Sequence, residues 1–169
     1  QAFVNIMRGC DNFCSYCIVP FVQGREYSRP LVDIIEEVKK LADDGVCEVT
    51  FLGQNVNSYG KGLNPRPALA DLLASAAEIE GVKRLKFVTS HPKDLTPALI
   101  EALKIPKVCP YLHLPAQSGS DRILRAMNRG YTREHYLDLL ARAREAVPDL
   151  AIASDFIVGF PGETDEDYK

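Results

Sequence analysis

Residues 10–17 read Cys-Asp-Asn-Phe-Cys-Ser-Tyr-Cys and place three cysteines on one short stretch with the spacing Cys-x3-Cys-x2-Cys. Three thiolates on a single loop can bind one soft metal centre together. The chain has five cysteines, an odd number that does not fit the paired framework of a small secreted protein. The stretch therefore predicts a metal-binding loop in a protein of a reducing compartment, which we expect to be the cytoplasm.

The identity of the metal depends on the fourth ligand. A structural zinc site needs four protein ligands, and His91, His113 and His135 all lie far from the loop in sequence. Cys47 and Cys109 lie at the starts of predicted strands, where an isolated cysteine is typically a small buried apolar residue. Three ligands on a cubane iron–sulfur cluster leave one iron open to an outside ligand. We expect a [4Fe–4S] cluster, and a zinc-binding or redox module remains the non-enzyme alternative.

The composition is that of one ordinary globular domain. Of the 169 residues, 46% are hydrophobic and 25% are charged, and the net charge of −3 argues against general polyanion binding. No apolar run approaches the ~18 residues that span a bilayer, so no membrane partner is expected. The chain starts at Gln1 and ends in residues typical of a helix start, and we interpret it as part of a longer protein.

Apolar strand-like runs alternate with segments of helical periodicity along the whole chain. The predicted strands cover residues 3–7, 48–52, 84–88, 109–114 and 150–158. The predicted helices cover residues 31–41, 69–77, 97–103, 121–127 and 133–146, and a further helix starts after residue 163. About five strand–helix units in series predict an α/β fold with a parallel sheet.

Polar residues follow the predicted strands where each one ends. The second strand is followed by Gly53-Gln54-Asn55, the third by Ser90 and the fourth by Gln117, and Asp155 lies within the fifth. Because the carboxyl ends of parallel strands meet at one edge, we expect these residues to line an active-site edge. An acid in an apolar strand is costly without a partner, so Asp155 is expected to face a pocket.

The cysteine loop, with Tyr16 before its last cysteine and a strand directly before it, resembles the radical S-adenosylmethionine superfamily. The resemblance covers residues 1–169 as one radical core domain. It implies a partial (βα)6 barrel, an incomplete TIM-like barrel with parallel strands. It also implies that Cys10, Cys14 and Cys17 hold a [4Fe–4S] cluster. The open iron of that cluster would bind S-adenosylmethionine, which is cleaved to a 5′-deoxyadenosyl radical.

The resemblance also implies a set of S-adenosylmethionine contacts. Residues after the second strand would receive the methionine part, although Gly-Gln-Asn departs from the commoner Gly-Gly-Glu. Polar side chains of later strands would contact the ribose or adenosyl group, an arginine would pair with the carboxylate, and an aromatic ring would lie near adenine. The expected contacts are Tyr16, Gly53, Gln54, Asn55, Ser90, Gln117, Arg129 and Asp155.

Two further strings resemble the methylthiotransferases, and most closely those of the MiaB type: Gly-Gln-Asn-Val-Asn-Ser-Tyr-Gly at 53–60 and Met-Asn-Arg-Gly-Tyr at 127–131. These enzymes convert N6-isopentenyladenosine next to the tRNA anticodon to its 2-methylthio form. The implied partners are the anticodon stem-loop and an electron donor such as flavodoxin or ferredoxin. Arg8, Arg25 and Arg29 are the expected phosphate contacts.

Two sibling enzymes remain as alternatives to this assignment. RimO-type enzymes methylthiolate an aspartate of a ribosomal protein, and a third type acts on threonylcarbamoyladenosine in tRNA. The resemblance further implies an N-terminal domain with a second [4Fe–4S] cluster, a last barrel unit and a C-terminal TRAM-like RNA-binding domain. None of these lies within residues 1–169, so we expect this segment not to perform the full reaction alone.

Overall fold

The structure is a computed structural model that describes all residues from 1 to 169. Its strands are β1 (Ala2–Asn5), β2 (Met7–Arg8), β3 (Tyr27–Ser28), β4 (Glu48–Leu52), β5 (Arg84–Phe87), β6 (Tyr111–His113) and β7 (Ala151–Ala153). Its α-helices are α1 (Val19–Val22), α2 (Leu31–Asp43), α3 (Leu69–Ala77), α4 (Pro97–Ala102), α5 (Asp121–Ala126), α6 (Arg133–Ala146) and α7 (Asp165–Tyr168). Two short 3-10 helices follow β4 and β5, η1 (Val56–Ser58) and η2 (Pro92–Asp94).

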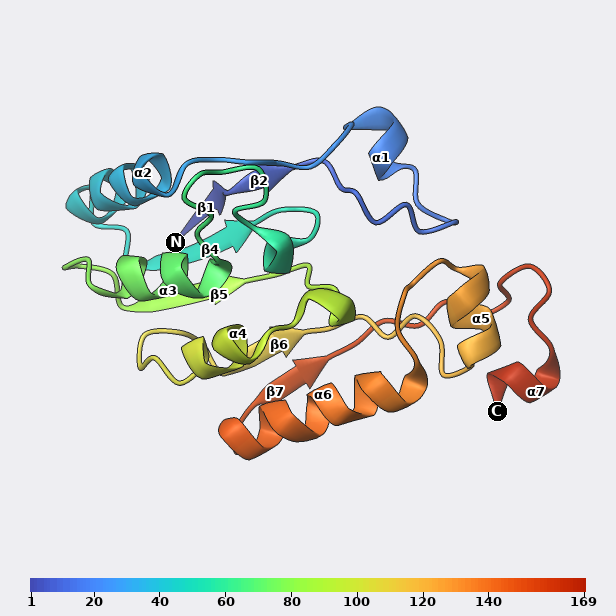
Figure 1. Cartoon of the computed structure of the whole chain (residues 1–169). Coiled ribbons are helices and arrows are strands. Elements are labelled where there is room, and N and C mark those ends of the chain that lie inside the picture. The colour runs from blue at the N-terminus through green and yellow to red at the C-terminus, as the bar shows by residue number, and fades with distance from the viewer.

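Five strands run parallel and direct their carboxyl ends to one edge (Figure 1). Strands β1, β4 and β5 form one sheet in the order β1-β4-β5, and β6 pairs with β7 in a second sheet. The amide of Leu85 donates to Lys107, and the amide of Cys109 donates back to Leu85, which makes a parallel bridge between the two sheets. The α/β class and the parallel strands predicted from the sequence are therefore confirmed, with the strands in open sheets.

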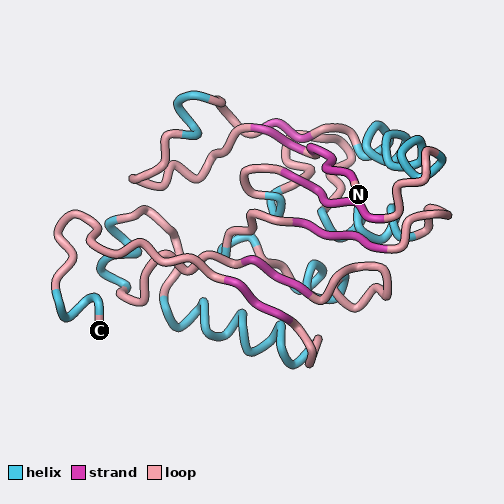
Figure 2. The backbone as a smooth tube through the Cα atoms, turned by 180° about the vertical axis from the view of Figure 1, so that it is seen from behind, coloured by secondary structure: helices cyan, strands magenta, loops and turns pink.

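The helices α2, α3, α4 and α6 lie on one face of the strands, so the view from behind shows the strands with no helix in front of them (Figure 2). The strand register explains which face they cover. Val4, Phe51 and Phe87 are register partners, and all three are buried on the helix side. Ile34 and Val38, one turn apart on α2, are also fully buried in this core. The helices thus cover one face of the sheet and leave the other face uncovered.

The helix-free face carries polar and charged side chains. Glu48 pairs with both Arg84 and Lys86 across β4 and β5, at 2.8 and 2.7 Å. On the second sheet the Nε2 atom of His113 lies 2.8 Å from a carboxylate oxygen of Asp155. Charged groups can occupy this face because it is not enclosed by a second helix layer. None of the helices is both long and apolar enough to cross a membrane.

Four of the five predicted strands are shorter in the structure, and for the first and the last of them the hydrogen bonds show the reason. The first strand stops at Asn5, because Met7–Arg8 pair in antiparallel fashion with Tyr27–Ser28 and not with β4. The strand predicted at 150–158 is only Ala151–Ala153 long. Beyond it, the amide of Ala116 donates to the Ser154 hydroxyl, so a side chain replaces the next ladder acceptor. The helices at 69–77 and 133–146 match their predicted bounds.

A pair of glycines after β4 gives a matched test of this fold. Both have a positive φ, 91° at Gly60 and 84° at Gly62, but only Gly60 has no room for a side chain. A Cβ at Gly60 would lie 1.7 Å from the Pro67 carbonyl oxygen, whereas at Gly62 nothing lies within 4 Å. We expect Gly62→Ala to cost about 1–2 kcal/mol of unfolding free energy.

Gly60→Ala should lower the unfolding free energy by at least about 2 kcal/mol more than Gly62→Ala does, because the backbone of residues 60 and 67 must separate. Denaturant unfolding of the two variants measures the difference. Equal destabilisation of the two would show that the close approach of this loop to Pro67 is not part of the folded state.

Candidate functional site

The cysteine loop leaves β2 and is fixed first to the chain segment that follows it. Gly9 has a φ of 69°, and a Cβ there would lie 2.2 Å from the carbonyl oxygen of Arg25. The amide of Cys10 donates to the carbonyl of Gly24. The Asp11 carboxylate accepts from Arg25 Nε at 2.6 Å and from Lys61 Nζ at 2.7 Å, and these two cations hold its pKa at about 2. The start of the loop is therefore tied to residues on both sides of it.

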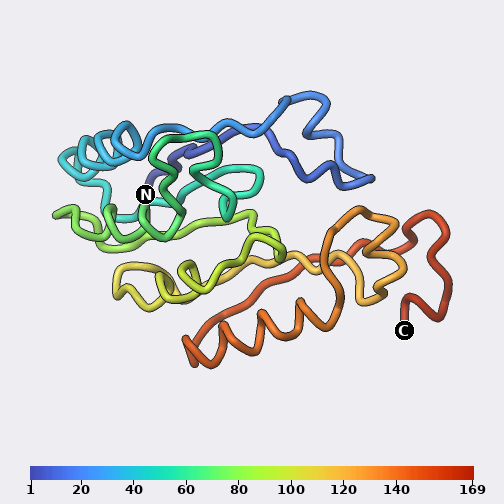
Figure 3. Tube along the Cα trace, viewed as in Figure 1, coloured from blue at the N-terminus to red at the C-terminus, as the bar shows by residue number.

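The second half of the loop is fixed by the far end of α5, which approaches it in space (Figure 3). The amide of Ser15 donates to the carbonyl of Met127, and the Ser15 hydroxyl donates to Ala126. The side-chain amide of Asn128 donates to the carbonyl of Phe13 at 3.0 Å. These contacts join segments more than 110 residues apart in the chain. They close one side of a cavity.

The cavity, of about 120 Å³, contains all three cysteines and the ends of several strands. It brings together eight residues that the sequence analysis singled out, and they come from five separate segments of the chain. These are Cys10, Cys14, Tyr16, Cys17, Gln54, Ser90, Gln117 and Arg129. Its other lining residues are Asn12, Val19, Thr89, His91 and Pro115. We call it the cysteine cavity.

Three expected contact residues do not line the cysteine cavity. Gly53 lies beside it, and a Cβ on this residue would lie 2.3 Å from Cγ of Met7, so the glycine makes room for Met7. Asn55 is buried with its amide 2.7 Å from Asp94. The side chain of Asp155 is 62% exposed on the helix-free face, where it binds His113. Asp155 was expected to face a pocket, but it does not line the cysteine cavity, because no other part of residues 1–169 covers this face.

Arg129 is the charged group at the centre of the cavity, and it is only 5% exposed. Its Nη1 lies 3.4 Å from Cys14 Sγ and 3.2 Å from the hydroxyl of Tyr16. Its Nη2 donates to the carbonyl of Pro115, and its Nε donates to the hydroxyl of Tyr131. A planar guanidinium fixed at three nitrogens can direct its charge at an anionic group beside the cysteine loop.

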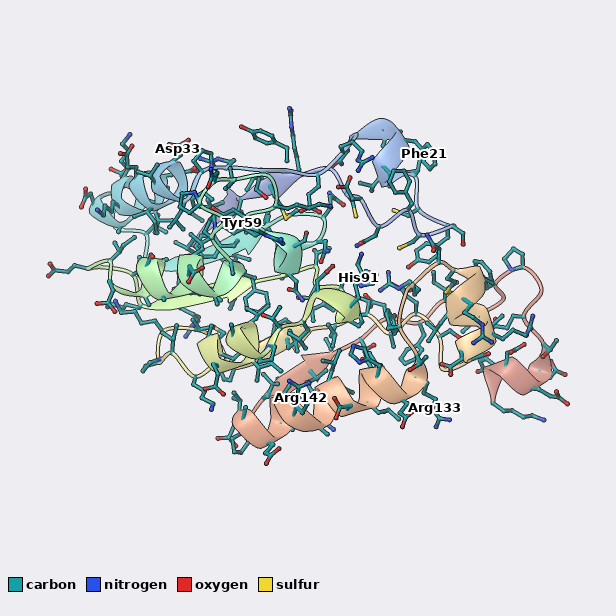
Figure 4. All side chains as sticks on the ribbon, in the orientation of Figure 1. Phe21, Asp33, Tyr59, His91, Arg133 and Arg142 are labelled. Atoms are coloured by element: carbon teal, nitrogen blue, oxygen red, sulfur yellow. The ribbon has the colours of Figure 1, made fainter.

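His91 was not among the predicted site residues, yet it lies in the cavity wall, beyond the end of β5 and facing the N-terminal loop (Figure 4). It is 4% exposed and packs edge-on against Tyr131 with ring centroids 5.6 Å apart. Burial, together with the nearby charge of Arg129, lowers the pKa of His91 to about 3. The imidazole is therefore neutral at pH 7. The only local signal for it was its place beside Ser90 in a strand-end motif.

Two polar atoms of the cavity wall have no hydrogen-bond partner in the protein. They are the hydroxyl of Ser90 and Nε2 of His91, both buried. A buried polar group without a partner costs free energy, so such atoms mark a place where a polar ligand can supply the missing bond. They fit a ligand with hydroxyl or amino groups, such as the nucleoside part of S-adenosylmethionine.

The three thiols line the cavity without forming a preassembled site for a single metal ion. No group of three or more His, Cys, Asp or Glu side chains is placed to hold such an ion. Burial raises the pKa of the Cys10 thiol, and Cys14 adds to this rise. Thiol protons therefore have to be displaced when a metal cluster binds, as metal-ligand cysteines require.

Backbone strain is concentrated at this cavity. Only four residues other than glycine have a positive φ: Phe13, Thr89, Gln117 and Asn128, between 48° and 69°. Thr89 and Gln117 line the cavity, Phe13 lies in the cysteine loop, and Asn128 binds that loop. Such conformations cost about 1–3 kcal/mol each and persist where the surrounding structure enforces them. Their location marks the cavity as the functional part of the molecule.

The three arginines expected to meet RNA differ in their partners. Arg25 binds Asp11, and Arg29 lies 2.7 Å from Glu37. Arg8 has no acidic partner, and its guanidinium lies over the ring of Tyr27, 5.5 Å from the centroid. Of the three cations, only Arg8 therefore has an uncompensated charge.

Comparison with solved structures supports the fold. The chain superposes on the radical S-adenosylmethionine methyltransferase TsrM from Kitasatospora setae with a TM-score of 0.76 and 19% identity, covering 98% of this chain and 32% of that one. The cobalamin-dependent radical enzyme OxsB gives a TM-score of 0.72 at 13% identity, over 92% of this chain and 23% of that one. At these identities the likeness concerns the fold alone.

Curated relatives are much closer in sequence. The chain is 57% identical over its whole length to a protein of Clostridium tetani named tRNA-2-methylthio-N(6)-dimethylallyladenosine synthase, and 56% identical to one of the same name from Moorella thermoacetica. It covers 38% of the length of each of these two relatives. The sequence profile described as the Radical SAM superfamily matches residues 4–169. The chain belongs to the radical SAM superfamily.

Proposed function

We propose that this chain is the catalytic core of a tRNA methylthiotransferase of the MiaB type, which converts N6-dimethylallyladenosine next to the anticodon to its 2-methylthio form. The observation that carries the proposal is the cysteine cavity, where three cysteines meet the ends of the parallel strands. The relatives named for this reaction are 57% and 56% identical to the chain. Because the chain spans 38% of their length, the complete reaction belongs to the longer protein.

Membership of the superfamily implies a [4Fe–4S] cluster and S-adenosylmethionine. Cys10, Cys14 and Cys17 would hold the cluster, which when bound would supply the electron for reductive cleavage of S-adenosylmethionine. Arg129 would bind the ligand's carboxylate, since its guanidinium already lies against the cysteine loop. Gln54 lines the same cavity and would contact the methionine part.

The unpartnered hydroxyl of Ser90 and the side chain of Gln117 would bind the ribose. Tyr16, hydrogen-bonded to Arg129, would lie near adenine. Gly53 and Asn55 would act by shaping the loop after β4, because their own atoms lie outside the cavity wall. Asp155 would act from the open face, next to His113, and not from within the cysteine cavity.

The open sheets fit a larger architecture. We propose that β1, β4, β5, β6 and β7 are five strands of a (βα)6 barrel, with residues 1–169 as its radical core. An N-terminal domain with a second cluster, a last barrel unit and a TRAM-like RNA-binding domain would complete the protein. The anticodon stem-loop and an electron donor such as flavodoxin or ferredoxin would be its partners.

The proposal is tested with the full-length protein and two anticodon stem-loop RNAs, one with and one without the dimethylallyl group. After anaerobic reconstitution with iron and sulfide, we expect 2-methylthiolation of the dimethylallylated RNA, detected by mass spectrometry of its nucleosides. Methylthiolation of a ribosomal-protein aspartate alone, or of threonylcarbamoyladenosine alone, would assign the chain to a sibling enzyme.

The cluster ligands give the first prediction from the site. Replacing Cys10, Cys14 or Cys17 by alanine should abolish iron binding and the visible absorbance of the reconstituted 169-residue chain, because a cubane needs all three thiolates. Cys47→Ala is the matched control, since Cys47 is an exposed free thiol far from the cavity. Equal iron content in all four variants would rule out a cluster at this loop.

Arg129 gives the second prediction. In Arg129→Lys the charge remains, but the planar fork that reaches Cys14, Tyr16 and Pro115 is lost. We expect S-adenosylmethionine to bind about 10- to 100-fold more weakly to the reconstituted protein, by equilibrium dialysis, with unchanged iron content. Arg125→Lys, an exposed change on α5, the helix that precedes Arg129, should bind normally. A normal affinity of Arg129→Lys for S-adenosylmethionine would mean that Arg129 only holds the cysteine loop in place and does not bind the ligand.

His91 predicts a pH dependence of stability. Its folded-state pKa of about 3 lies below its ordinary value of 6.5, so at intermediate pH the unfolded chain binds the proton first. Stability should therefore fall by about 1.4 kcal/mol per pH unit as the pH decreases below 6.5. Denaturant unfolding between pH 7 and pH 5 measures this slope. His91→Asn should reduce it, while His135→Asn, at an exposed position on α6, should retain it.

A further inference from the structure

A larger recess of about 690 Å³ lies next to the cysteine cavity. Gln54 and Thr89 line both, so the two spaces adjoin at the ends of β4 and β5. The volume lies within the range of about 300–1,000 Å³ that is typical of small-molecule sites. The other lining residues are Asn5, Met7, Arg8, Gln23, Tyr27, Arg29, Leu52 and Gly53. We call it the β2–β3 recess, because both strands of that ribbon contribute to it.

A planar surface forms one wall of the β2–β3 recess. Arg8 and Tyr27 are register partners on the antiparallel strands β2 and β3, and the guanidinium lies over the ring. The Tyr27 side chain is nevertheless 54% exposed. An aromatic ring with an adjacent guanidinium is the type of surface on which unpaired bases stack. The ribbon therefore presents a stacking platform to the recess.

The charge at this wall is available to a ligand. The Arg8 side chain forms no ion pair and no hydrogen bond with the protein, whereas that of Arg29, also in the lining, binds Glu37 and the carbonyl of Asn5. An uncompensated arginine beside an aromatic ring suits a phosphate attached to a stacked nucleoside. One cation is sufficient for one nucleotide, while the net charge of −3 disfavours general RNA binding.

The floor of the recess is apolar and its sides carry amides. Leu52 lies at the end of β4 opposite Asn5, and Met7 fills the space that Gly53 leaves. The side chains of Asn5, Gln23 and Gln54 bring both donors and acceptors to the same space. An apolar floor with amides around it suits a base that carries both a polar edge and a hydrocarbon substituent.

We propose that the β2–β3 recess holds the dimethylallyl-modified adenosine, with its base stacked on Tyr27, its phosphate on Arg8 and its dimethylallyl group against Leu52 and Met7. The inference rests on the proposed function and specifies its substrate site. The shared residues Gln54 and Thr89 place the base directly beside the cysteine cavity, where the cofactor would act. A ribosomal-protein aspartate would use Arg8 but would gain nothing from the stacking platform.

Binding of the full-length protein to the dimethylallylated anticodon stem-loop, measured by fluorescence anisotropy without S-adenosylmethionine, tests the platform. Tyr27→Ala should weaken binding about 10- to 100-fold, and Tyr27→Phe should stay within about threefold of wild type. Tyr111→Ala is the matched control, a partly exposed tyrosine on β6 outside the recess, and it should bind like wild type. Iron content and circular dichroism verify that each variant is folded.

Two other variants test the proposed phosphate contact and the proposed contact with the dimethylallyl group. Each is measured as a salt dependence or as a preference between two RNAs, because neither quantity changes when part of the protein is unfolded. Arg8→Gln should lower the slope of log affinity against log salt by about one, and Arg142→Gln on α6 should leave it unchanged. Leu52→Thr should lower the preference for dimethylallylated over unmodified RNA at least about fivefold.

The outcomes separate this inference from the proposed function. Equal affinities of Tyr27→Ala and Tyr111→Ala would overturn the recess as the base site, while a wild-type preference for dimethylallylated RNA would leave the proposed function intact. Binding of a ribosomal-protein peptide that depends on Arg8 but not on Tyr27 would also overturn it. Failure of the wild-type protein to bind either RNA would remove the proposed function and this inference together.

Discussion

The hydrogen bonds between the cysteine loop and the end of α5 are the contacts on which the rest of the site depends. They bring Ser15 and Asn128, 113 positions apart, to opposite sides of one short interface. The residue after Asn128 is Arg129, so the same interface places the guanidinium against Cys14. Without this closure the second half of the loop would have no fixed position relative to the strand ends, because no regular strand or helix holds residues 9–18 and the contacts of Cys10 and Asp11 fix only the start of the loop.

The two faces of the sheet have different roles. One face packs against the helices and stabilises the fold, and the other is free to carry functional groups. Apolar residues such as Val4, Phe51 and Phe87 pack against the helices on one face. The other face and the carboxyl edge are left for charged and polar groups. Strained backbone at Thr89 and Gln117 lies at this edge. The stability gained from a large core offsets the cost of these conformations and of the unpartnered polar atoms beside them.

Much of the fold followed from periodicity, because amphipathic helices reveal their buried face locally. The helices at 69–77 and 133–146 and the strand at 48–52 have their predicted bounds. The short strands were harder to predict. In the segment predicted at 150–158 the run remains apolar, but only tertiary pairing reveals that Ser154 takes a hydrogen bond from Ala116 and interrupts the ladder, which resumes at the parallel bridge of Gln117 and Phe156. The open face around Asp155 could not be predicted either, since burial depends on what covers a strand and not on its sequence.

The sequence by itself determined the soft-metal loop, the parallel α/β class and the polar residues at the strand ends, because ligand spacing and hydrophobic periodicity are local properties. Only the tertiary structure decided which of those residues share a cavity. It brought His91 and Tyr131 to the cysteines, placed Asn55 and Asp155 outside the cavity, and left Arg8 without an acidic partner. These outcomes depend on contacts between distant segments, whose geometry is set by how helices and strands pack and not by any single stretch of sequence.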